Sequence, residues 1–312
     1  MMKRIKKAIF ILFLTGSFCA VSSFRHRPPT RPPQKHALHT IVIDPGHGGF
    51  DPGTHGLFSK EKDVTLAISL KLGKAIQEEF PQIKVVYTRT TDVMPGNATN
   101  IHEGLRYRAD LANKAKGDLF LCIHANSNGH PPGRYEERNL VGYKWVKKGR
   151  KKRKVPVYDS RMVKNMTVGT ATYIWKAMWG QYKSSVINEE NMGDSTAEPV
   201  DMDTPEARIR AQLYEKKYFA NSAFFGELVQ NEFIKAGRRS EGVQQREVGI
   251  WVLEATGMPS VLIETGYLTN IDEEKYLNSR EGQGEVVRNI LTALKLYNQS
   301  LEGKRTSAQD NP

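Results

Sequence analysis

Two histidines in this sequence stand at the ends of strongly apolar runs. The first run begins at Ile41 and reads I-V-I-D-P-G-H-G-G, so that His47 follows a proline and a glycine. The second begins at Leu119 and reads L-F-L-C-I-H, ending at His124. Such continuous apolar runs are typical of strands buried on both faces, and proline and glycine end them. Because ligands bind at the carboxyl ends of strands in open α/β sheets, the two histidines form a candidate metal site.

A catalytic zinc ion has three protein ligands and one open position, so this site needs one more carboxylate or histidine. We expect Glu61 to be that ligand, because it lies at the end of the loop that leaves His47, just before a predicted helix. His55 remains an alternative, whereas Asp63 is expected to cap the helix. The acidic residues that compete with Glu61 are Asp44, Asp51 and Asp63.

A third apolar run, from Val261 to Gly266, reads V-L-I-E-T-G and ends on Glu264. A glutamate is disfavoured there unless a neighbouring group needs its charge, although an ion pair or a polar strand end would also explain it. Next to a zinc ion, a glutamate can act as a general base and then pass a proton to a departing amine. Zinc itself makes water more acidic and polarises a carbonyl, so this set of residues suits hydrolysis of an amide.

The elements that would position these residues alternate between strands and helices. Their order in the first part of the chain predicts a mainly parallel sheet with helices on its faces. Apolar residues recur every four positions from Val64 to Phe80, which predicts a helix from Asp63 that ends before Pro81. Leu213 is assigned to the apolar face of a later, long helix. The predicted strands are residues 41–44, 83–88, 118–124, 168–175, 248–253 and 260–264, and the predicted helices are residues 63–80, 98–116, 205–236, 272–278 and 285–301.

Two predicted insertions interrupt this alternation, at residues 128–166 and 176–206. The first contains the basic run Lys147 to Lys154, which reads K-K-G-R-K-K-R-K. A run of this kind is typical of a solvated surface segment, and the alternative is an electrostatic contact with an anionic partner, such as cell-wall glycan or another anionic polymer. The second insertion is partly acidic and includes Glu189 and Glu190.

The amino-terminal sequence is typical of an exported protein. Residues 1–22 run from basic to apolar to small side chains, as in a secretory signal peptide. A short membrane anchor and a lipid-modified Cys19 remain alternatives. Residues 23–38 are predicted to form a Pro/Arg-rich spacer and residues 302–312 a disordered tail.

The chain is strongly basic, and charge alone does not choose among the anionic partners that would suit it, which are nucleic acid, a membrane surface and a cell-wall polymer. The chain has 46 Lys and Arg against 34 Asp and Glu, for a net charge of +12, which suits an anionic partner. We expect a secreted or periplasmic protein with no stable membrane span after signal cleavage. A nuclear-localisation role for the basic run conflicts with the secretory signal, and no nucleic-acid partner is expected.

Four motifs carry a resemblance to a known family. They read D-P-G-H-G-G (44–49), E-K-D-V-T-L from residue 61, L-C-I-H-A-N-S (121–127) and P-S-V-L-I-E-T-G-Y-L-T-N (259–270). In this order they resemble the secreted zinc-dependent N-acetylmuramoyl-L-alanine amidases of bacteria. The resemblance implies a single α/β domain, residues 39–301, with a mixed, mainly parallel sheet of about six strands flanked by helices.

The resemblance also implies a reaction and a set of roles. Members of the family cut the amide between N-acetylmuramic acid and the L-alanine of peptidoglycan stem peptides, in cell-wall remodelling or daughter-cell separation. The zinc ligands would be His47, Glu61 and His124, which decides for Glu61 over His55. Glu264 would be the catalytic glutamate.

Regulation is a further implication of the resemblance. In some family members a helix covers the active site until a partner protein displaces it, and the insertion 176–206 stands at that place in the sequence. We expect Glu189 and Glu190 to reach the zinc ion in an inactive state, and an activator protein to displace the insertion.

Two other functions remain as alternatives. A zinc carboxypeptidase acting on cell-wall peptides would need an arginine such as Arg89, Arg108 or Arg246 to bind a free carboxylate. A binding module with a structural zinc would need four protein ligands, often cysteines. Only Cys122 remains for that purpose once residues 1–22 are removed.

Overall fold

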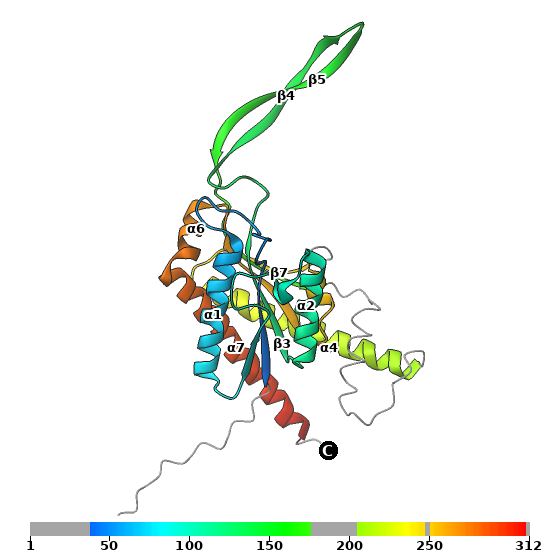
Figure 1. Ribbon diagram of the computed structural model, residues 1–312, viewed down its shortest axis with the longest axis vertical. Coiled ribbons are helices and arrows are strands. Elements are labelled where there is room, and N and C mark those ends of the chain that lie inside the picture. The colour runs from blue at the N-terminus through cyan, green and yellow to red at the C-terminus, as the bar shows by residue number, and fades with distance from the viewer. Residues whose placement is uncertain (1–37, 176–204, 247–249, 310–312) are drawn as a thin grey trace, which may run out of the picture. The chain divides into compact units, whose positions relative to one another are not determined.

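The computed structural model of the protein describes residues 38–175, 205–246 and 250–309 (Figure 1). The strands in this part of the chain are β1 (Thr40–Pro45), β2 (Lys84–Tyr87), β3 (Leu119–Asn126), β4 (Arg134–Lys148), β5 (Lys151–Lys164), β6 (Thr170–Trp175), β7 (Ser240–Arg246) and β8 (Ser260–Tyr267). The helices are α1 (Glu61–Glu79), the 3-10 turn η1 (Pro95–Asn97), α2 (Ile101–Lys114), α4 (Pro205–Lys235), α5 (Trp251–Glu254), α6 (Ile271–Asn278) and α7 (Arg280–Gln309).

Six strands form one sheet in the order β2-β1-β3-β8-β6-β7. All neighbouring pairs are parallel except β6 and β8, which run antiparallel. The predicted fold class, a mixed and mainly parallel sheet flanked by helices, is therefore confirmed. Because β1, β3 and β8 are parallel neighbours, their carboxyl ends meet at one edge of the sheet.

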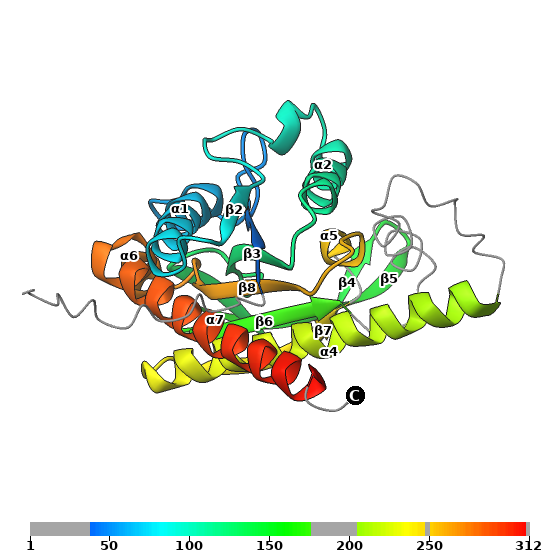
Figure 2. The same ribbon diagram turned by 90° about the horizontal axis from the view of Figure 1, so that it is seen from below.

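Both faces of the sheet are buried, which explains the apolar runs in its strands. In β1, Ile41 and Ile43 pack into one hydrophobic core, and Val42 packs into a second core on the opposite face. Helices α1, α4 and α7 contribute to the first core, and α2 and α5 to the second. Figure 2 shows α4 and α7 on one side of strands β6 and β8 and α2 and α5 on the other.

Helix α1 begins at Glu61, two residues before the predicted start. The prediction that Asp63 caps this helix is wrong, because Lys60 is the capping residue and makes no side-chain cap. Asp63 lies in the first turn, where a negative charge interacts favourably with the helix dipole. The earlier start has a consequence for the site, since it places Glu61 on a helix rather than on a loop.

The strand predicted at residues 248–253 is wrong for the residues that the structure describes there. Trp251, Val252 and Leu253 belong to the short helix α5, which packs against the second core. A short apolar run does not by itself distinguish a strand from a buried helical turn. The strand at the edge of the sheet is instead β7, whose mostly polar side chains lack the expected apolar pattern.

Two long helices differ from the prediction in detail. Phe225, Val229 and Phe233 of α4 are buried as expected, but Leu213 is 63% exposed. Helix α7 continues through residues 302–309, which were predicted as part of a disordered tail. This polar segment contains no proline, and most of its residue types tolerate a helix, so polar composition did not mean disorder there.

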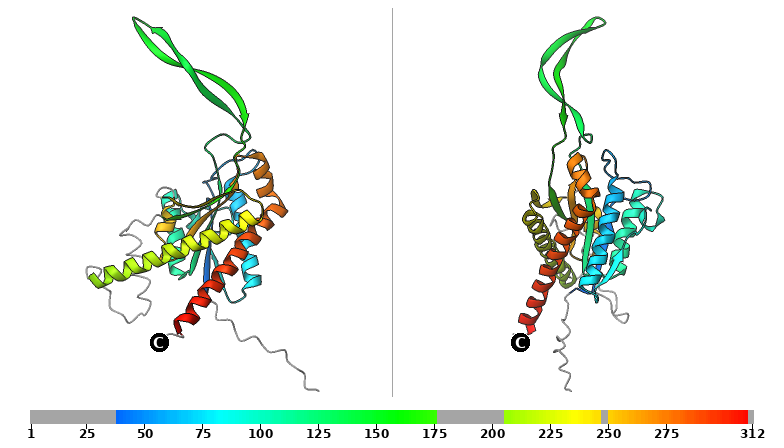
Figure 3. Two further views of the ribbon diagram at one scale, coloured as in Figure 1. Left: turned by 180° about the vertical axis from the view of Figure 1, so that it is seen from behind. Right: turned by 90° about the vertical axis from the view of Figure 1, so that its left-hand side faces the viewer.

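Within the first insertion, residues 134–164 form an antiparallel hairpin of β4 and β5, which the sequence did not predict. None of these residues is buried, which agrees both with a solvated surface segment and with the alternative of contact with an anionic partner. Figure 3 shows the two strands winding around each other. At the base, the N–H of Asn165 donates to the carbonyl oxygen of Gly133 at 2.7 Å, and the N–H of Gly133 donates to that of Thr269 at 3.0 Å.

Several predictions lie outside the described residues. They are the signal peptide 1–22, nearly all of the spacer 23–38, and the insertion 176–206 up to residue 204, including Glu189 and Glu190. Leu38, the last residue of the predicted spacer, is buried in the first core, and its N–H donates to Asn298 Oδ1 at 3.2 Å. Among the described helices, none combines the length and the apolar character needed to cross a membrane.

Candidate metal centre

His47 lies on the turn after β1, in a backbone conformation that residues other than glycine rarely adopt. Its φ angle is +59°. Two buried arginines donate hydrogen bonds to the backbone of this turn. Arg89 donates to the carbonyl oxygens of Pro45 and Gly46 at 3.1 and 2.7 Å. Arg108 donates to those of Pro45 and His47 at 2.9 and 2.7 Å. These bonds stabilise the strained turn and thereby fix the position of the His47 imidazole.

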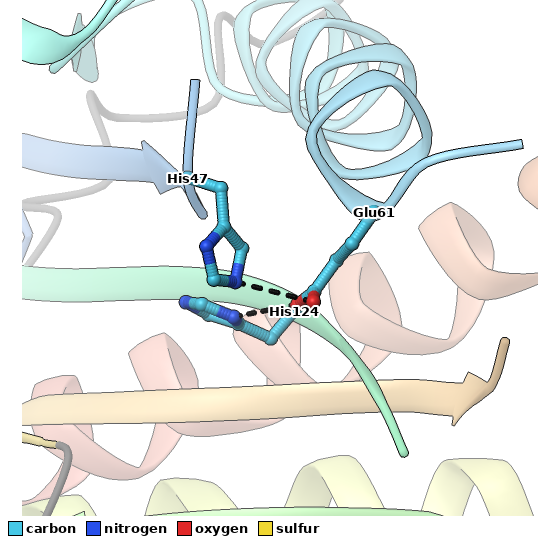
Figure 4. Close-up of side chains that lie close together, drawn as sticks. All are labelled: His47, Glu61 and His124. Atoms are coloured by element: carbon cyan, nitrogen blue, oxygen red, sulfur yellow. Dashed lines mark hydrogen bonds and ion pairs between the residues drawn. The ribbon is translucent and has the colours of Figure 1, made fainter. Parts of the chain in front are cut away.

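Glu61 joins the two histidines, as Figure 4 shows. Its Oε2 lies 3.1 Å from His47 Nε2, and its Oε1 lies 2.8 Å from His124 Nδ1. One ligand atom from each of the three residues lies within 4.8 Å of the other two. Glu61 is only 3% exposed, and the N–H groups of Thr54 and Ala125 also donate to its oxygens. The structure therefore brings together the three side chains that the sequence predicted to converge.

The rival ligands lie elsewhere or do other work. Asp44 is buried beneath the turn, where it pairs with Arg108 and accepts a hydrogen bond from Thr88. His55 and Asp63 are exposed and do not belong to the cluster. A carboxylate that is already paired with a buried arginine is not available to a metal ion.

Asp51 supports His47 instead of competing with Glu61. Its Oδ2 lies 2.8 Å from Nδ1 of His47, and its Oδ1 accepts a hydrogen bond from the N–H of Gly53. A carboxylate on one ring nitrogen fixes the orientation of the ring and leaves Nε2, which faces Glu61, as the ligand atom. This role was not predicted from the sequence, although Asp51 lies only four residues after His47.

The cluster attracts positive charge. Burial lowers the pKa of His47, but the hydrogen bonds to Asp51 and Glu61 outweigh it and raise the pKa to about 10. Burial opposes ionisation of Glu61, yet the hydrogen bonds from His124 and His47 hold its pKa well below the usual range. The two carboxylates therefore stabilise a cation among the imidazoles, and a divalent metal ion is such a cation.

Two glycines allow the rings and the carboxylate to come this close. A Cβ atom on Gly46 would lie 2.5 Å from the His124 ring. A Cβ atom on Gly53 would lie 2.5 Å from the His47 ring and 2.6 Å from Oε2 of Glu61. Any side chain at either position would displace a residue of the cluster.

Glu264 lies on β8, directly opposite His124 in the register of the sheet. It is 7% exposed, and within the described chain its Oε2 has no hydrogen-bond partner. Burial, reinforced by the negative charge of Glu61, raises the pKa of Glu264 well above its usual range. Glu264 therefore provides a buried carboxyl group beside the cluster, and this carboxyl group holds a proton readily.

A cavity of about 640 Å³ opens beside the cluster, between α2 and α5. Its walls combine the site histidines with apolar side chains of both helices. The residues that line it include His47, His124, Ile101, Leu105, Trp251 and Leu253. This space gives a ligand access to the imidazoles.

Glu274 of α6 fixes the loop that runs from His47 to Glu61, a role that the sequence analysis did not predict. Its carboxylate is completely buried and accepts hydrogen bonds from the N–H groups of Leu57, Phe58 and Ser59 at 2.8 to 2.9 Å. The Ser59 hydroxyl donates a fourth bond at 2.8 Å. The end of the loop is thereby fixed next to α1.

The fold and this cluster define an α/β protein with two imidazoles and a carboxylate in a metal-type arrangement. A sequence profile of the N-acetylmuramoyl-L-alanine amidase family matches residues 41–296. The chain belongs to this family.

Two curated relatives illustrate the similarity. AmiC of Escherichia coli O6:H1 is 29% identical over 82% of this chain and 52% of AmiC. AmiC of Neisseria meningitidis serogroup B is 26% identical over 82% of this chain and 52% of that protein. The chain thus spans about half the length of these relatives.

Solved structures show the same fold. The N-acetylmuramoyl-L-alanine amidase from Clostridium difficile 630 superposes with a TM-score of 0.53 at 24% identity, covering 84% of this chain and 98% of that chain. The CwlD amidase from Clostridioides difficile, solved in complex with the GerS lipoprotein, gives a TM-score of 0.55 at 21% identity, covering 83% and 98%. At these identities the likeness concerns the arrangement of strands and helices.

Proposed function

We propose that this chain is a zinc-dependent N-acetylmuramoyl-L-alanine amidase. It would hydrolyse the amide between N-acetylmuramic acid and the L-alanine of the peptidoglycan stem peptide, in cell-wall remodelling or daughter-cell separation. The observation that supports this most is the approach of His47, Glu61 and His124 to one another in a chain of the amidase family.

The donor atoms suit zinc. Two imidazole nitrogens and one carboxylate oxygen are a common set of protein ligands in catalytic zinc sites, which keep a further position open. His47, Glu61 and His124 would hold the ion, with Asp51 orienting His47. When bound, zinc would supply Lewis acidity, which polarises a carbonyl and makes water a better nucleophile.

Glu264 is the proposed catalytic acid–base group. It would take a proton from the attacking water and deliver it to the nitrogen of L-alanine as the C–N bond breaks. Its burial and raised pKa favour this role, because the carboxyl group can keep the proton until the amine departs. Arg89 and Arg108 would keep His47 in place during the reaction through their bonds to the turn.

The cavity between α2 and α5 is the proposed place of the substrate. Its apolar walls would exclude water from one side of the scissile amide, and the imidazoles of His47 and His124 are part of its lining. The substrate polymer, peptidoglycan, would make this chain a protein of the cell envelope. Export through a signal peptide at residues 1–22 belongs to the same proposal.

Regulation by the insertion 176–206 is also part of the proposal. Glu189 and Glu190 would reach the metal ion in an inactive state, until an activator protein displaces the insertion. CwlD in its complex with GerS is an example of an amidase of this fold with a protein partner. Deleting residues 181–203 should raise basal activity, and a folded deletion protein with unchanged or lower activity would contradict the idea.

The alternative of a zinc carboxypeptidase has little support. It needs an arginine that is free to bind a terminal carboxylate. Arg89 and Arg108 are buried and donate to backbone carbonyls of the His47 turn, which leaves the exposed Arg246, whose guanidinium lies 5.2 Å from the centroid of the Tyr173 ring. The match to the amidase family favours the amidase over this alternative. Amidase action would release whole stem peptides with a free L-alanine amine, whereas a carboxypeptidase would release single carboxyl-terminal residues.

Digestion of purified sacculi followed by mass spectrometry of the products tests the proposal. We expect release of intact stem peptides, its loss on chelation, and its recovery when zinc is added. Glu264→Gln should keep its zinc and its fold and lose activity by about 1,000-fold. Release of single amino acids, or full activity in Glu264→Gln, would overturn the proposal.

A further inference from the structure

The distal half of the β4–β5 hairpin carries a dense positive charge. Between Arg138 and Asp159 the sequence contains no acidic residue and the basic residues Lys144, Lys147, Lys148, Arg150, Lys151, Lys152, Arg153 and Lys154. At the base of the hairpin, by contrast, basic side chains have acidic partners, as in the ion pairs Arg138–Glu136 and Lys164–Asp272. Within the described chain, none of the distal basic residues has such a partner.

Large apolar side chains stand exposed next to these charges. Trp145 is 69% and Tyr143 58% exposed, and Leu140, Val141 and Val146 are exposed as well. The strand register puts Trp145 opposite Lys154 and Tyr143 opposite Pro156, so aromatic and basic side chains share one face of the hairpin. An aromatic and aliphatic surface of this kind is not needed for solubility, and it indicates a partner with an apolar component.

We propose that the distal half of the hairpin docks on the surface of an anionic phospholipid membrane. Lysine and arginine side chains near such a surface are attracted to the lipid phosphates. Tryptophan and tyrosine occupy the headgroup level of a bilayer, between water and the acyl chains. The hairpin offers both kinds of side chain together. This function is peripheral binding, and it is separate from the proposed hydrolysis.

The dimensions of the hairpin fit this role. Strand β4 has 15 residues and β5 has 14, which at roughly 3.3 Å per residue gives a length of about 45 Å. Beyond its base, no hydrogen bond or ion pair joins it to another described part of the chain. A narrow element that is bonded only at its base can contact a flat surface without steric conflict from the helices and the sheet.

A glycan polymer fits the same surface less well. Aromatic side chains recognise sugars by stacking on an open ring face, but the Lys154 ammonium lies 4.4 Å from the centroid of the Tyr143 ring and occupies one face. The exposed side chains of Val141 and Val146 offer no hydrogen-bonding groups to a hydrophilic polymer. A lipid surface accounts for the basic, aromatic and aliphatic residues at once.

Vesicle co-sedimentation of the full chain tests the proposal. Phosphatidylcholine vesicles with about 30 mol% phosphatidylglycerol should bind the protein, and pure phosphatidylcholine vesicles should not. Raising the salt from roughly 0.1 M to 0.5 M should weaken the binding strongly. The combined Lys147→Gln, Lys148→Gln, Lys151→Gln and Lys152→Gln variant should bind about 100-fold more weakly.

A matched control separates the hairpin from net charge. The combined Lys84→Gln, Lys114→Gln, Lys216→Gln and Lys217→Gln variant removes the same charge from exposed lysines outside the hairpin and should bind as the native protein does. Vesicles should also shift the tryptophan emission to shorter wavelength, and Trp145→Phe should remove that shift although three other tryptophans remain of the 4 in the chain.

Three results would overturn the proposal. The first is equal vesicle binding by the native protein and the hairpin variant. The second is no binding to anionic vesicles together with binding of purified sacculi that depends on the same lysines, which would assign the hairpin to the cell-wall polymer. The third is an emission shift that persists in Trp145→Phe. None of these results depends on amidase activity.

Discussion

Charged residues are concentrated in two regions, the edge of the sheet where β1, β3 and β8 end and the distal half of the β4–β5 hairpin. The surroundings of the charges differ between the two. At the edge, Asp44, Glu61 and Arg108 are buried, and each has a partner of opposite charge or a set of hydrogen bonds. On the distal half of the hairpin, the basic residues are exposed and their charges accumulate without acidic neighbours. Buried charges in this protein therefore specify a geometry, whereas exposed charges specify a partner. Substitutions in the two regions should therefore have different consequences.

The largest contrast is expected for the metal ligands. His124→Ala removes one of three side chains that converge on one point, so the purified protein should lose nearly all of its zinc and activity should fall by about 1,000-fold or more. Lys148→Ala on the hairpin should change neither quantity. Elemental analysis of zinc per chain, alongside activity on sacculi, makes the measurement. A His124→Ala protein with a full zinc complement would show that the cluster is not the metal site.

The second largest effect is expected for removal of Glu274, which fixes the loop between His47 and Glu61. Glu274→Ala removes the buried carboxylate that accepts from the N–H groups of Leu57, Phe58 and Ser59, so the free energy of unfolding should fall by about 3 kcal/mol. Glu136→Ala, which removes an acidic residue from the exposed hairpin, should leave the free energy of unfolding nearly unchanged. Urea denaturation of both variants gives the comparison. Equal effects would mean that burial of charge does not distinguish the two regions.

Removing the negative charge of Asp51, which orients His47, should have a smaller effect. Asp51→Asn keeps the size of the side chain but removes the negative charge beside Nδ1, so zinc affinity should fall by about 10-fold to 100-fold with the fold intact. Competition with a chromogenic chelator measures the affinity. Unchanged affinity would assign Asp51 to the structure of the loop alone.

The smallest effect is expected for excision of the hairpin. Because the N–H of Asn165 bonds to the carbonyl of Gly133, residues 134–164 can be replaced by a two-glycine link without stretching the chain. The free energy of unfolding should change by no more than about 0.5 kcal/mol, since none of the removed residues is buried. Activity on a soluble muramoyl-peptide should be retained. Loss of folding on excision would show that the hairpin stabilises the sheet.

Much of the site could be predicted from the sequence because its signals are local. An apolar run predicts a buried strand, and a histidine or glutamate at its end marks a candidate functional residue, as at His47, His124 and Glu264. The parallel order of strands then brings those ends to one edge of the sheet. The position of Glu61 next to a helix start completed the set, with the family resemblance deciding between it and His55.

The features that the sequence did not predict depend on contacts between distant segments. Glu274 resembles any surface glutamate of a helix until the loop at Ser59 packs against it. Strand β7 is half-buried at the edge of the sheet, so its polar residues carry no apolar periodicity. The β4–β5 hairpin has no buried face at all, and therefore gives no alternation by which its strands could be recognised.

The order of the site residues along the chain has a consequence for biosynthesis. His47, Glu61 and His124 all belong to the first half of the polypeptide, whereas Glu264 follows on the last strand of the sheet. During synthesis and export, the three proposed metal ligands therefore emerge before Glu264, the proposed acid–base group. If the proposed function holds, the protein would stay inactive during its own production until the final strand inserts beside β3.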